Sequence, residues 1–298
     1  MKMIYPKWRE LEINPKEISF KKIQLQKIIN YLPAGNDVVE CKCIYNERSV
    51  PLFIKIERSK MADFAAEVKN ISLLKNNGYY EKMPPIIEHG IINEKKYIVL
   101  EKVNGRRLSE FINKKSYIVR RKNFLEKYGK ELAKIHQIPY LKFDVAKQRP
   151  INDFPKENFY RKTDAFAENY IKYLRDNKPN IKYNSFIHGD FHYANILWKK
   201  EQIVGVLDYE YSGKGLKEQD IAWAIVLRPT QVFMDNWEDV FNFLQGYQKV
   251  TTFDKDLLKW CLINAYIHFY LMNIDNENYI LKIQKLIALI MKNLPVLY

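Results

Sequence analysis

The sequence predicts an α+β fold with two lobes: a small N-terminal lobe built on an antiparallel β-sheet with helices, and a larger, mainly helical C-terminal lobe. Short apolar runs typical of strands fill the first hundred residues, whereas longer segments with apolar residues three and four positions apart dominate the remainder. The chain has 298 residues, 47% of them hydrophobic, which is enough for about two domains. We therefore expect domains over residues 1–103 and 104–298.

The expected elements of the N-terminal lobe follow from residue periodicity and turn signals. A helix is expected over residues 61–76, where Phe64, Val68, Ile71 and Leu74 recur at helical spacing and Gly78 follows. A further helix is expected to begin near Asn14 and to continue over residues 18–29. Strands are expected over residues 38–45, 52–56, 86–92 and 97–103.

The C-terminal lobe is expected to contain helices joined by short strands. A strand over residues 203–207 would deliver Asp208 at its end. The expected helices cover residues 108–112, 117–137, 237–248, 255–272 and 278–294.

Residues 188–195 and Asp208 have the spacing of a kinase catalytic loop. Phosphoryl transfer requires an aligned nucleophile and cations held against phosphate oxygens. Asp190 lies two residues after His188 and five before Asn195, so it would accept the proton of a substrate hydroxyl. Asn195 and Asp208 offer the hard oxygen ligands that suit Mg²⁺.

Each part of this pattern has an alternative explanation. A single His-Gly-Asp is an ordinary turn, but the complete ordered set between apolar strands favours a catalytic loop. His188 is expected to be structural. A zinc site at His188 and His192 is disfavoured because no further Cys or His lies nearby in the sequence.

These residues resemble the aminoglycoside phosphotransferase and choline kinase superfamily of small-molecule kinases. The matching features are His-Gly-Asp-x-x-x-x-Asn, the Leu-Asp-Tyr around Asp208, and Asp220 followed by Ile and Ala. The resemblance spans roughly residues 34–223. It implies a bilobal protein-kinase-like fold, with residues 1–103 as the nucleotide-binding lobe and 104–298 as the catalytic and substrate-binding lobe.

The N-terminal lobe offers candidates for nucleotide binding. Lys55 lies in an apolar strand and needs an anionic partner, for which Glu67 is the obvious candidate. The resemblance implies that Lys55 contacts ATP phosphates, that Glu67 orients it, and that a turn with Gly35 and Asn36 covers the phosphates. The alternative is that Lys55 extends from an edge strand and Glu67 lies on a solvated helix face.

The resemblance also implies cofactors and an adenine-binding linker. The backbone near Glu101 and Val103 would hold the nucleotide base of ATP, with GTP not excluded, and Mg²⁺ would be required. Only one glycine occupies the phosphate turn, where protein kinases have Gly-x-Gly-x-x-Gly. No Arg precedes Asp190 and the segment after Asp208 is short, so protein substrates are disfavoured.

Candidate substrate residues lie in the C-terminal lobe. Glu210 would add a carboxylate near the metals or the substrate, or is a solvated turn residue. Asp164 and Glu168 would attract a polycationic aminoglycoside, and Tyr170 would stack on a sugar or a quaternary ammonium. The alternatives are an exposed acidic helix face and a core aromatic residue.

The resulting hypothesis is an ATP- and Mg²⁺-dependent O-phosphotransferase that acts on a hydroxyl of a small molecule, with or without an amine. An aminoglycoside is the leading candidate; choline or ethanolamine, sugar and amino-alcohol kinases are alternatives. An alternative of another class is a catalytically silent kinase-like binding or coat-type module.

Composition favours a cytoplasmic protein that binds no nucleic acid. The net charge is +14, but lysines are spread along the whole sequence and form no basic stripe. The cysteines, Cys41, Cys43 and Cys261, suggest no disulfide framework. Signal-peptide and membrane-spanning segments are not expected, and the sequence does not determine the oligomeric state.

Overall fold

The computed structural model describes residues 9–58, 62–112, 114–149, 160, 162–229 and 231–294. The chain divides into two compact units. The first comprises Met1–Gly105 and Val204–Glu210, and the second comprises Arg106–Ile203 and Tyr211–Tyr298. The division into a nucleotide-binding domain and a catalytic domain at residues 103 and 104 stays a prediction, and Asp208 belongs to the first unit.

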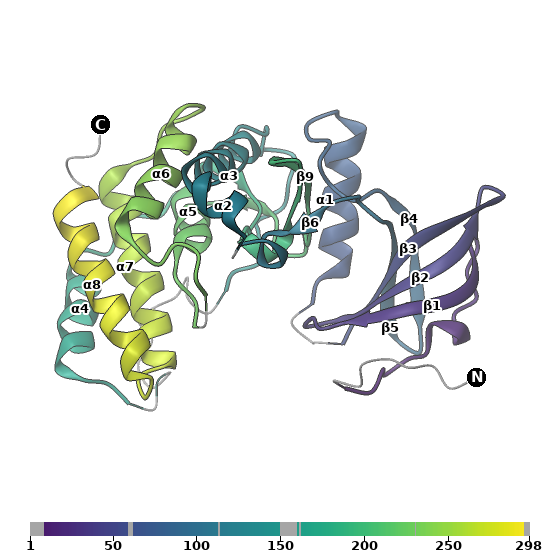
Figure 1. The fold of residues 1–298 in the computed structure, drawn as a ribbon, viewed down its shortest axis with the longest axis horizontal. Coiled ribbons are helices and arrows are strands. Elements are labelled where there is room, and N and C mark those ends of the chain that lie inside the picture. Colours follow the sequence, from purple (N-terminus) through teal and green to yellow (C-terminus); the bar gives the residue numbers. More distant parts are fainter. Residues whose placement is uncertain are drawn as a thin grey trace. The chain divides into compact units, whose positions relative to one another are not determined.

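A five-stranded antiparallel sheet forms the first unit, and one long helix, α1 (Phe64–Asn76), lies along it (Figure 1). The strand order is β1-β2-β3-β5-β4, and all neighbouring strands are antiparallel. β5 pairs with both β3 and β4, so the chain passes through α1 and β4 before it returns beside β3. The strands are β1 (Gln24–Leu32), β2 (Asp37–Tyr45), β3 (Arg48–Ile56), β4 (Ile86–Ile92) and β5 (Lys95–Glu101). The expected α+β class is confirmed, and the central strand β3 carries Lys55.

The helix expected over residues 18–29 is wrong. Asn14 accepts the N–H of Lys16 and caps only a short 3-10 turn, η1 (Pro15–Glu17), before the chain extends into β1. β-Branched residues favour strands, and pairing with β2 buries Ile28 and Tyr31 while Ile29 stays exposed. The capping signal at Asn14 therefore determines a single 3-10 turn, and pairing with β2 determines the conformation of residues 24–32.

Helix α1 positions Glu67 on its buried face. Asp63 caps the helix by accepting the N–H of Ala66 at 3.0 Å, and Gly78 adopts φ +62° just after its end. Phe64, Glu67 and Ile71 are buried, spaced at three and four residues. The predicted first residues of this helix fall partly outside the described residues.

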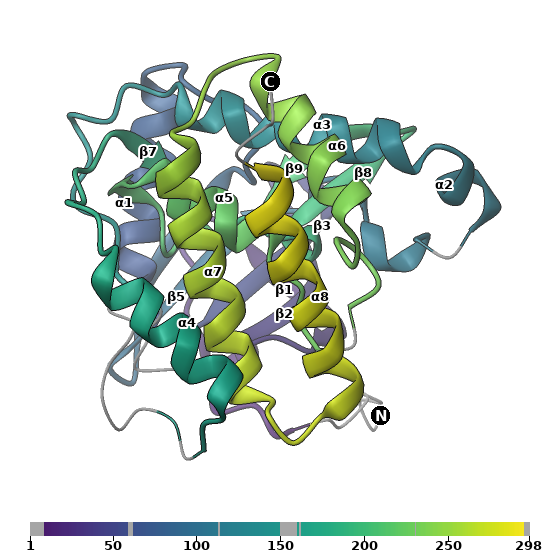
Figure 2. The ribbon, with the colours of Figure 1, turned by 90° about the vertical axis from the view of Figure 1, so that its left-hand side faces the viewer.

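The second unit is mainly helical. Figure 2 shows α7 between α4 and α8, and α3 packs against α6. The predicted helix over residues 117–137 is interrupted at Arg120, and the segment at residues 108–112 forms a 3-10 turn, η2 (Leu108–Glu110). The helices are α2 (Lys115–Val119), α3 (Arg121–His136), α4 (Ala165–Asp176), α5 (Lys217–Ile225), α6 (Trp237–Gln248), α7 (Lys255–Met272) and α8 (Glu277–Asn293).

Short strands hold the segment that carries the kinase-like motif. β7 precedes it and pairs antiparallel with β10, while η4 (Tyr193–Asn195) leads from it into β8, which pairs with β6 and β9. The strands are β6 (Arg106–Arg107), β7 (Ser185–Ile187), β8 (Ile196–Lys199), β9 (Gln202–Val206) and β10 (Gly213–Gly215). Among the described residues, none of the helices has the length and apolar character needed to cross a membrane.

Candidate active site

Lys55 lies between two carboxylates in the first unit. Its Nζ is 2.7 Å from Oε2 of Glu67 and 2.6 Å from Oδ1 of Asp208. The Lys55 side chain is 8% exposed and that of Glu67 is fully buried, whereas that of Asp208 is 34% exposed. The structure therefore brings together three of the predicted residues, and Lys55 is not an edge residue extending into solvent.

The charges around Lys55 keep it cationic. Burial alone would lower the pKa of the Lys55 ammonium, but the carboxylates of Asp208 and Glu67 outweigh burial and raise that pKa above its ordinary value. The ammonium also lies 5.1 Å from the centre of the Phe64 ring. A fixed cation of this kind is suited to holding phosphate oxygens.

Asp208 follows β9 in an unusual backbone conformation. Its φ is +71°, in the left-handed region that few residues other than glycine adopt. Just before it, Val206 donates its N–H to the carbonyl of Lys82 and ties this segment to the first unit. Asp208 therefore follows the end of a strand, as predicted, and its contact with Lys55 is an addition to that prediction.

The turn with Gly35 and Asn36 is held by polar contacts within the same unit. Arg9 donates to the carbonyl oxygens of Gly35 at 3.2 Å and Asn36 at 2.7 Å. Asn36 is buried, accepts the N–H of Arg58 and donates to Glu210 at 3.4 Å. A Cβ added to Gly35 would meet nothing within 4 Å, so the protein itself does not require glycine there.

The linker residues Glu101 and Val103 follow the last strand of the sheet. Glu101 is exposed and donates its N–H to the carbonyl of Pro85 at 2.9 Å. The carbonyl of Val103 accepts the N–H of Gly105 at 3.0 Å. These contacts fix the backbone at the end of the first unit.

Asp190 and Asn195 are in direct contact in the second unit. Asn195 Nδ2 donates to the Asp190 carbonyl oxygen at 3.0 Å and to its Oδ2 at 3.2 Å. Asn195 is buried, and this contact turns its amide oxygen away from Asp190. His192 caps η4 by accepting the N–H of Ala194, and its Nε2 lies 3.7 Å from Asp190 Oδ2.

Asp220 fixes the backbone before Asp190. It accepts the N–H groups of His188 at 2.7 Å and Gly189 at 3.0 Å, and it contacts His136 Nε2 at 3.1 Å. Burial alone would raise the pKa of Asp220, but the hydrogen bonds from His136 and His188 lower it below its ordinary value. The later Asp of the motif is thus a support for the loop.

Gly189 is required by its surroundings. Its φ is +75°, and a Cβ there would lie 2.2 Å from the carbonyl oxygen of Tyr211. The glycine between His188 and Asp190 is therefore required for steric reasons in this fold.

Two residues missed by the sequence argument contact Asp190. Trp223 Nε1 donates to Asp190 Oδ1 at 2.9 Å, and Arg149 Nη2 lies 2.8 Å from the same oxygen. Arg149 also donates to the carbonyl of Gly189 at 3.0 Å. Trp223 directly follows the Asp-x-Ala motif and could have been noticed, whereas Arg149 belongs to no motif in the sequence.

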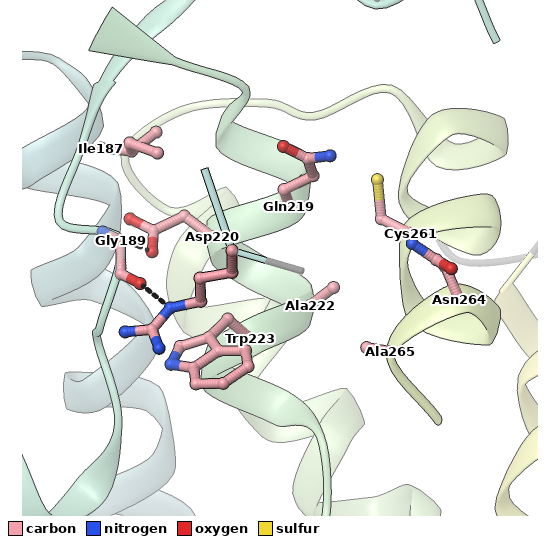
Figure 3. A pocket seen from close by; sticks show the side chains of 10 residues that line it. Ile187, Gly189, Gln219, Asp220, Ala222, Trp223, Cys261, Asn264 and Ala265 are labelled. Atoms are coloured by element: carbon pink, nitrogen blue, oxygen red, sulfur yellow. Dashed lines mark hydrogen bonds between the residues drawn. The ribbon is translucent and has the colours of Figure 1, made fainter. Parts of the chain in front are cut away.

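A cavity of about 40 Å³ adjoins these residues. Arg149, Gly189 and Trp223 line one part of it. Figure 3 shows Gln219, Asp220 and Trp223 on one helix, with Cys261, Asn264 and Ala265 on the facing one.

The residues expected to bind an amine have other surroundings. Asp164 caps α4, accepting the N–H of Ala167 at 2.8 Å and the hydroxyl of Tyr270 at 2.6 Å. Asp164 therefore lies just before α4, whereas the sequence predicted it on an acidic face of a helix. Glu168 is exposed in the first turn of α4, and Tyr170 is half-buried against Phe166.

A carboxylate and an amide oxygen, such as those of Asp208 and Asn195, would suit magnesium better than a transition metal. Mg²⁺ is commonly held by one or two protein carboxylates together with substrate phosphates and waters. The Asp208 carboxylate is partly exposed and the Asn195 amide oxygen faces away from Asp190, so both residues fit such a role. Within the described ranges, no three His, Cys, Asp or Glu side chains gather as a metal cluster.

Several solved structures have the same fold at low sequence identity. An aminoglycoside-3'-phosphotransferase of type VIII has a TM-score of 0.56 and 17% identity, covering 82% of this chain and 93% of its own. An apo thermostable mutant of aminoglycoside phosphotransferase APH(4)-Ia has a TM-score of 0.57 and 12% identity, covering 90% and 95%. Choline kinase LicA from Streptococcus pneumoniae has a TM-score of 0.53 and 14% identity, covering 90% and 94%.

No curated protein matches the sequence significantly. The profile of the phosphotransferase enzyme family, in contrast, matches residues 32–254, which include Lys55, Glu67, Asp190, Asn195 and Asp208. This protein is therefore a phosphotransferase, and the chain belongs to the phosphotransferase enzyme family.

Proposed function

We propose that this enzyme transfers the γ-phosphate of ATP, with Mg²⁺, to a hydroxyl of a small molecule. The supporting observation is the buried Lys55 ammonium, bonded both to Glu67 and to Asp208. A buried cation is costly without partners, and partners drawn from a helix and from a loop 153 residues away in sequence indicate a built phosphate site.

Each residue has a distinct role in this proposal. Asp190 accepts the proton of the acceptor hydroxyl, with its carboxylate oriented by Asn195 and Trp223. Lys55 holds phosphate oxygens and Glu67 holds Lys55. Asn195 and Asp208 hold Mg²⁺, which when bound neutralises charge on the transferring phosphate.

In this proposal, backbone groups as well as side chains of the first unit bind the nucleotide. The turn at Gly35 and Asn36 lies over the phosphates, where the missing Cβ of Gly35 allows close approach. The backbone from Glu101 to Val103 binds the base. ATP is proposed, and GTP is the alternative nucleotide to be compared with it.

The acceptor is a small hydroxylated molecule, and aminoglycosides, choline, ethanolamine, sugars and amino alcohols are the classes to compare. We assign the enzyme to the cytoplasm, because Cys41, Cys43 and Cys261 are free, buried thiols that suit a reducing compartment. No observation favours a catalytically silent module over an enzyme.

Phosphate transfer from Mg·ATP across these acceptor classes tests the proposal. We expect a product with one acceptor class, and the Asp190→Asn variant should lose about 10²- to 10⁴-fold in rate while keeping Mg·ATP affinity. Asp176→Asn, on the exposed end of α4, is the matched control. An undiminished rate in Asp190→Asn would overturn the base assignment, and failure of the wild type to bind Mg·ATP would overturn the proposed cofactor.

A further inference from the structure

Two arginines approach Trp223 in the second unit. The Arg149 guanidinium carbon lies 4.2 Å from the centre of a Trp223 ring, and that of Arg228 lies 4.6 Å from it. Arg149 is also 3.8 Å from the Tyr211 ring, and Arg228 is 5.7 Å from the Phe269 ring. Stacking on aromatic rings fixes both planar guanidiniums beside Asp190.

Among the described residues named here, two guanidiniums face one carboxylate, that of Asp190. Asp190 is the carboxylate that pairs directly with Arg149, and it also attracts Arg228. Burial lowers the pKa of the Arg228 guanidinium, the Asp190 carboxylate opposes this, and the nearby Arg149 charge lowers it further. Asp220, whose carboxylate also lies beside this loop, is already bonded to two backbone N–H groups and to His136. An added anion would balance the two guanidiniums.

Both guanidiniums retain N–H groups for a ligand. Arg149 directs Nε at Gly189 and Nη2 at Asp190, while Arg228 donates to the carbonyls of Val226 at 3.3 Å and Trp223 at 3.1 Å. Within the part of the chain that the structure describes, these contacts are one hydrogen bond and one ion pair for Arg149 and two hydrogen bonds for Arg228. A guanidinium has five N–H donors, and its planar fork matches carboxylate and phosphate oxygens.

The surroundings of Asp190 do not suit a polycation. A cationic acceptor would have to approach Asp190 against the guanidiniums of Arg149 and Arg228. A polycationic substrate is normally recognised by carboxylates, since like charges cost binding energy. The sign of the charge beside the proposed base therefore selects the substrate class.

We propose that the phosphate acceptor is a hydroxylated molecule carrying an anionic group, a carboxylate or a phosphate, and that Arg149 and Arg228 bind this group beside Trp223. This inference rests on the proposed function, because it takes Asp190 as the base for the acceptor hydroxyl. The adjoining cavity, lined in part by Arg149 and Trp223, receives a small substituent of the acceptor.

Binding of matched acids, neutral molecules and amines to the full chain tests this inference directly. Glucuronate, glucose and glucosamine form one series, and glycerate, glycerol and 2-amino-1,3-propanediol form another; ligand-observed NMR reads their affinities without turnover. We expect each acid to bind at least about tenfold more tightly than its neutral and amine counterparts, as a charge-assisted contact to arginine provides. Equal affinities within each series, tighter binding of the amines, or no binding of either acid would overturn the inference.

Arginine variants assign the site. Arg228→Met and Arg149→Met should each lower the ratio of acid affinity to neutral affinity by about 10- to 100-fold, and Arg228→Lys should lower it less because charge is kept. Arg106→Met removes a 54% exposed arginine paired with Glu110 and should leave the ratio unchanged. A purely structural role would change all affinities alike, so an unchanged ratio in both methionine variants would overturn the assignment.

Activity separates this inference from the proposed function. Phosphate transfer from Mg·ATP to glucosamine or glucose in preference to glucuronate would keep the kinase and overturn the anionic acceptor. Arginine-dependent binding of the acids by a protein that does not bind Mg·ATP would overturn the proposed nucleotide and support the anion site.

Discussion

Lys55 Nζ lies 2.6 Å from Asp208 Oδ1, although the two residues are 153 positions apart in the sequence. The same nitrogen is bonded to Glu67, so one ammonium holds a helix residue and a loop residue at once. Glu67 is fully buried, whereas Asp208 is partly exposed, as the metal-binding role proposed for it requires. This difference in exposure separates the structural partner of Lys55 from the proposed metal ligand.

Lys55→Met should destabilise the protein and weaken nucleotide binding. Removing one partner of a buried ion pair leaves an uncompensated charge on Glu67 and costs about 3–5 kcal/mol in the free energy of unfolding. Chemical denaturation and Mg·ATP titration measure the two effects. Lys102→Met, which breaks a surface pair with Glu40, should cost no more than about 1 kcal/mol.

The double variant Lys55→Met, Glu67→Leu distinguishes stability from function. It removes both buried charges, so much of the lost stability should return while nucleotide affinity stays low. Restored nucleotide affinity in the double variant would show that Lys55 does not contact phosphate.

Asp208→Asn should raise the Mg²⁺ concentration needed for half-maximal activity by at least about tenfold. Asparagine tolerates the left-handed backbone at φ +71°, so the loop conformation should be kept. Activity titrated with Mg²⁺, before and after removal of metal by a chelator, measures this change. The same Mg²⁺ dependence in wild type and variant would exclude Asp208 as a ligand.

Gly189→Ala should lower stability, whereas Gly35→Ala should weaken nucleotide binding with little change in stability. A Cβ at Gly189 meets the Tyr211 carbonyl at 2.2 Å, with φ at +75°, so Gly189→Ala should lower stability by at least about 1–2 kcal/mol and disturb the loop of Asp190. A Cβ at Gly35 meets no protein atom within 4 Å, so Gly35→Ala should change the free energy of unfolding by no more than about 1 kcal/mol. If Gly35 lies over phosphate, its variant should nevertheless bind Mg·ATP more weakly; unchanged affinity would contradict that placement.

His268 should make the protein less stable below neutral pH. Burial lowers the pKa of His268 to about 4, and its Nδ1 lies 2.6 Å from the hydroxyl of Tyr160. The unfolded chain binds the proton with a pKa of about 6.5, so the contribution of neutral His268 is complete above that pH and declines as pH falls from 6.5 to 4, by roughly 3 kcal/mol.

Unfolding free energies of His268→Gln between pH 7 and pH 4 test this dependence. Glutamine can accept the Tyr160 hydrogen bond without titrating, so the variant should lose less stability over that range than the wild type. His89→Gln alters an exposed histidine and is the control. A pH dependence as steep in His268→Gln as in the wild type would contradict the assignment.

Regular elements were largely predictable because their signals are local. The periodic apolar residues of α1 predict a helix, and the alternating apolar residues of β2 predict a strand. Asp63 and Gly78 mark the two ends of the helix. The first strand was not predictable in the same way. An Asn-Pro turn beginning at Asn14 resembles a helix start, and only pairing with β2 decides that residues 24–32 extend.

The sequence by itself determined the family and the candidate catalytic groups, because phosphoryl transfer requires particular residue types at fixed short spacing, as at Asp190 and Asn195. It also proposed Glu67 as the partner of Lys55, which the structure confirms. Contacts can be predicted from spacing along the chain when the two residues belong to one motif or to neighbouring elements.

Only the tertiary structure decided which groups surround Asp190. Arg149 lies 41 positions before Asp190 and Trp223 lies 33 after it, and no pattern links the three until helices and strands pack together. Asp164, expected to attract an amine, instead caps a helix and bonds Tyr270. Charge selectivity depends on distances between residues remote in sequence, and folding alone sets those distances.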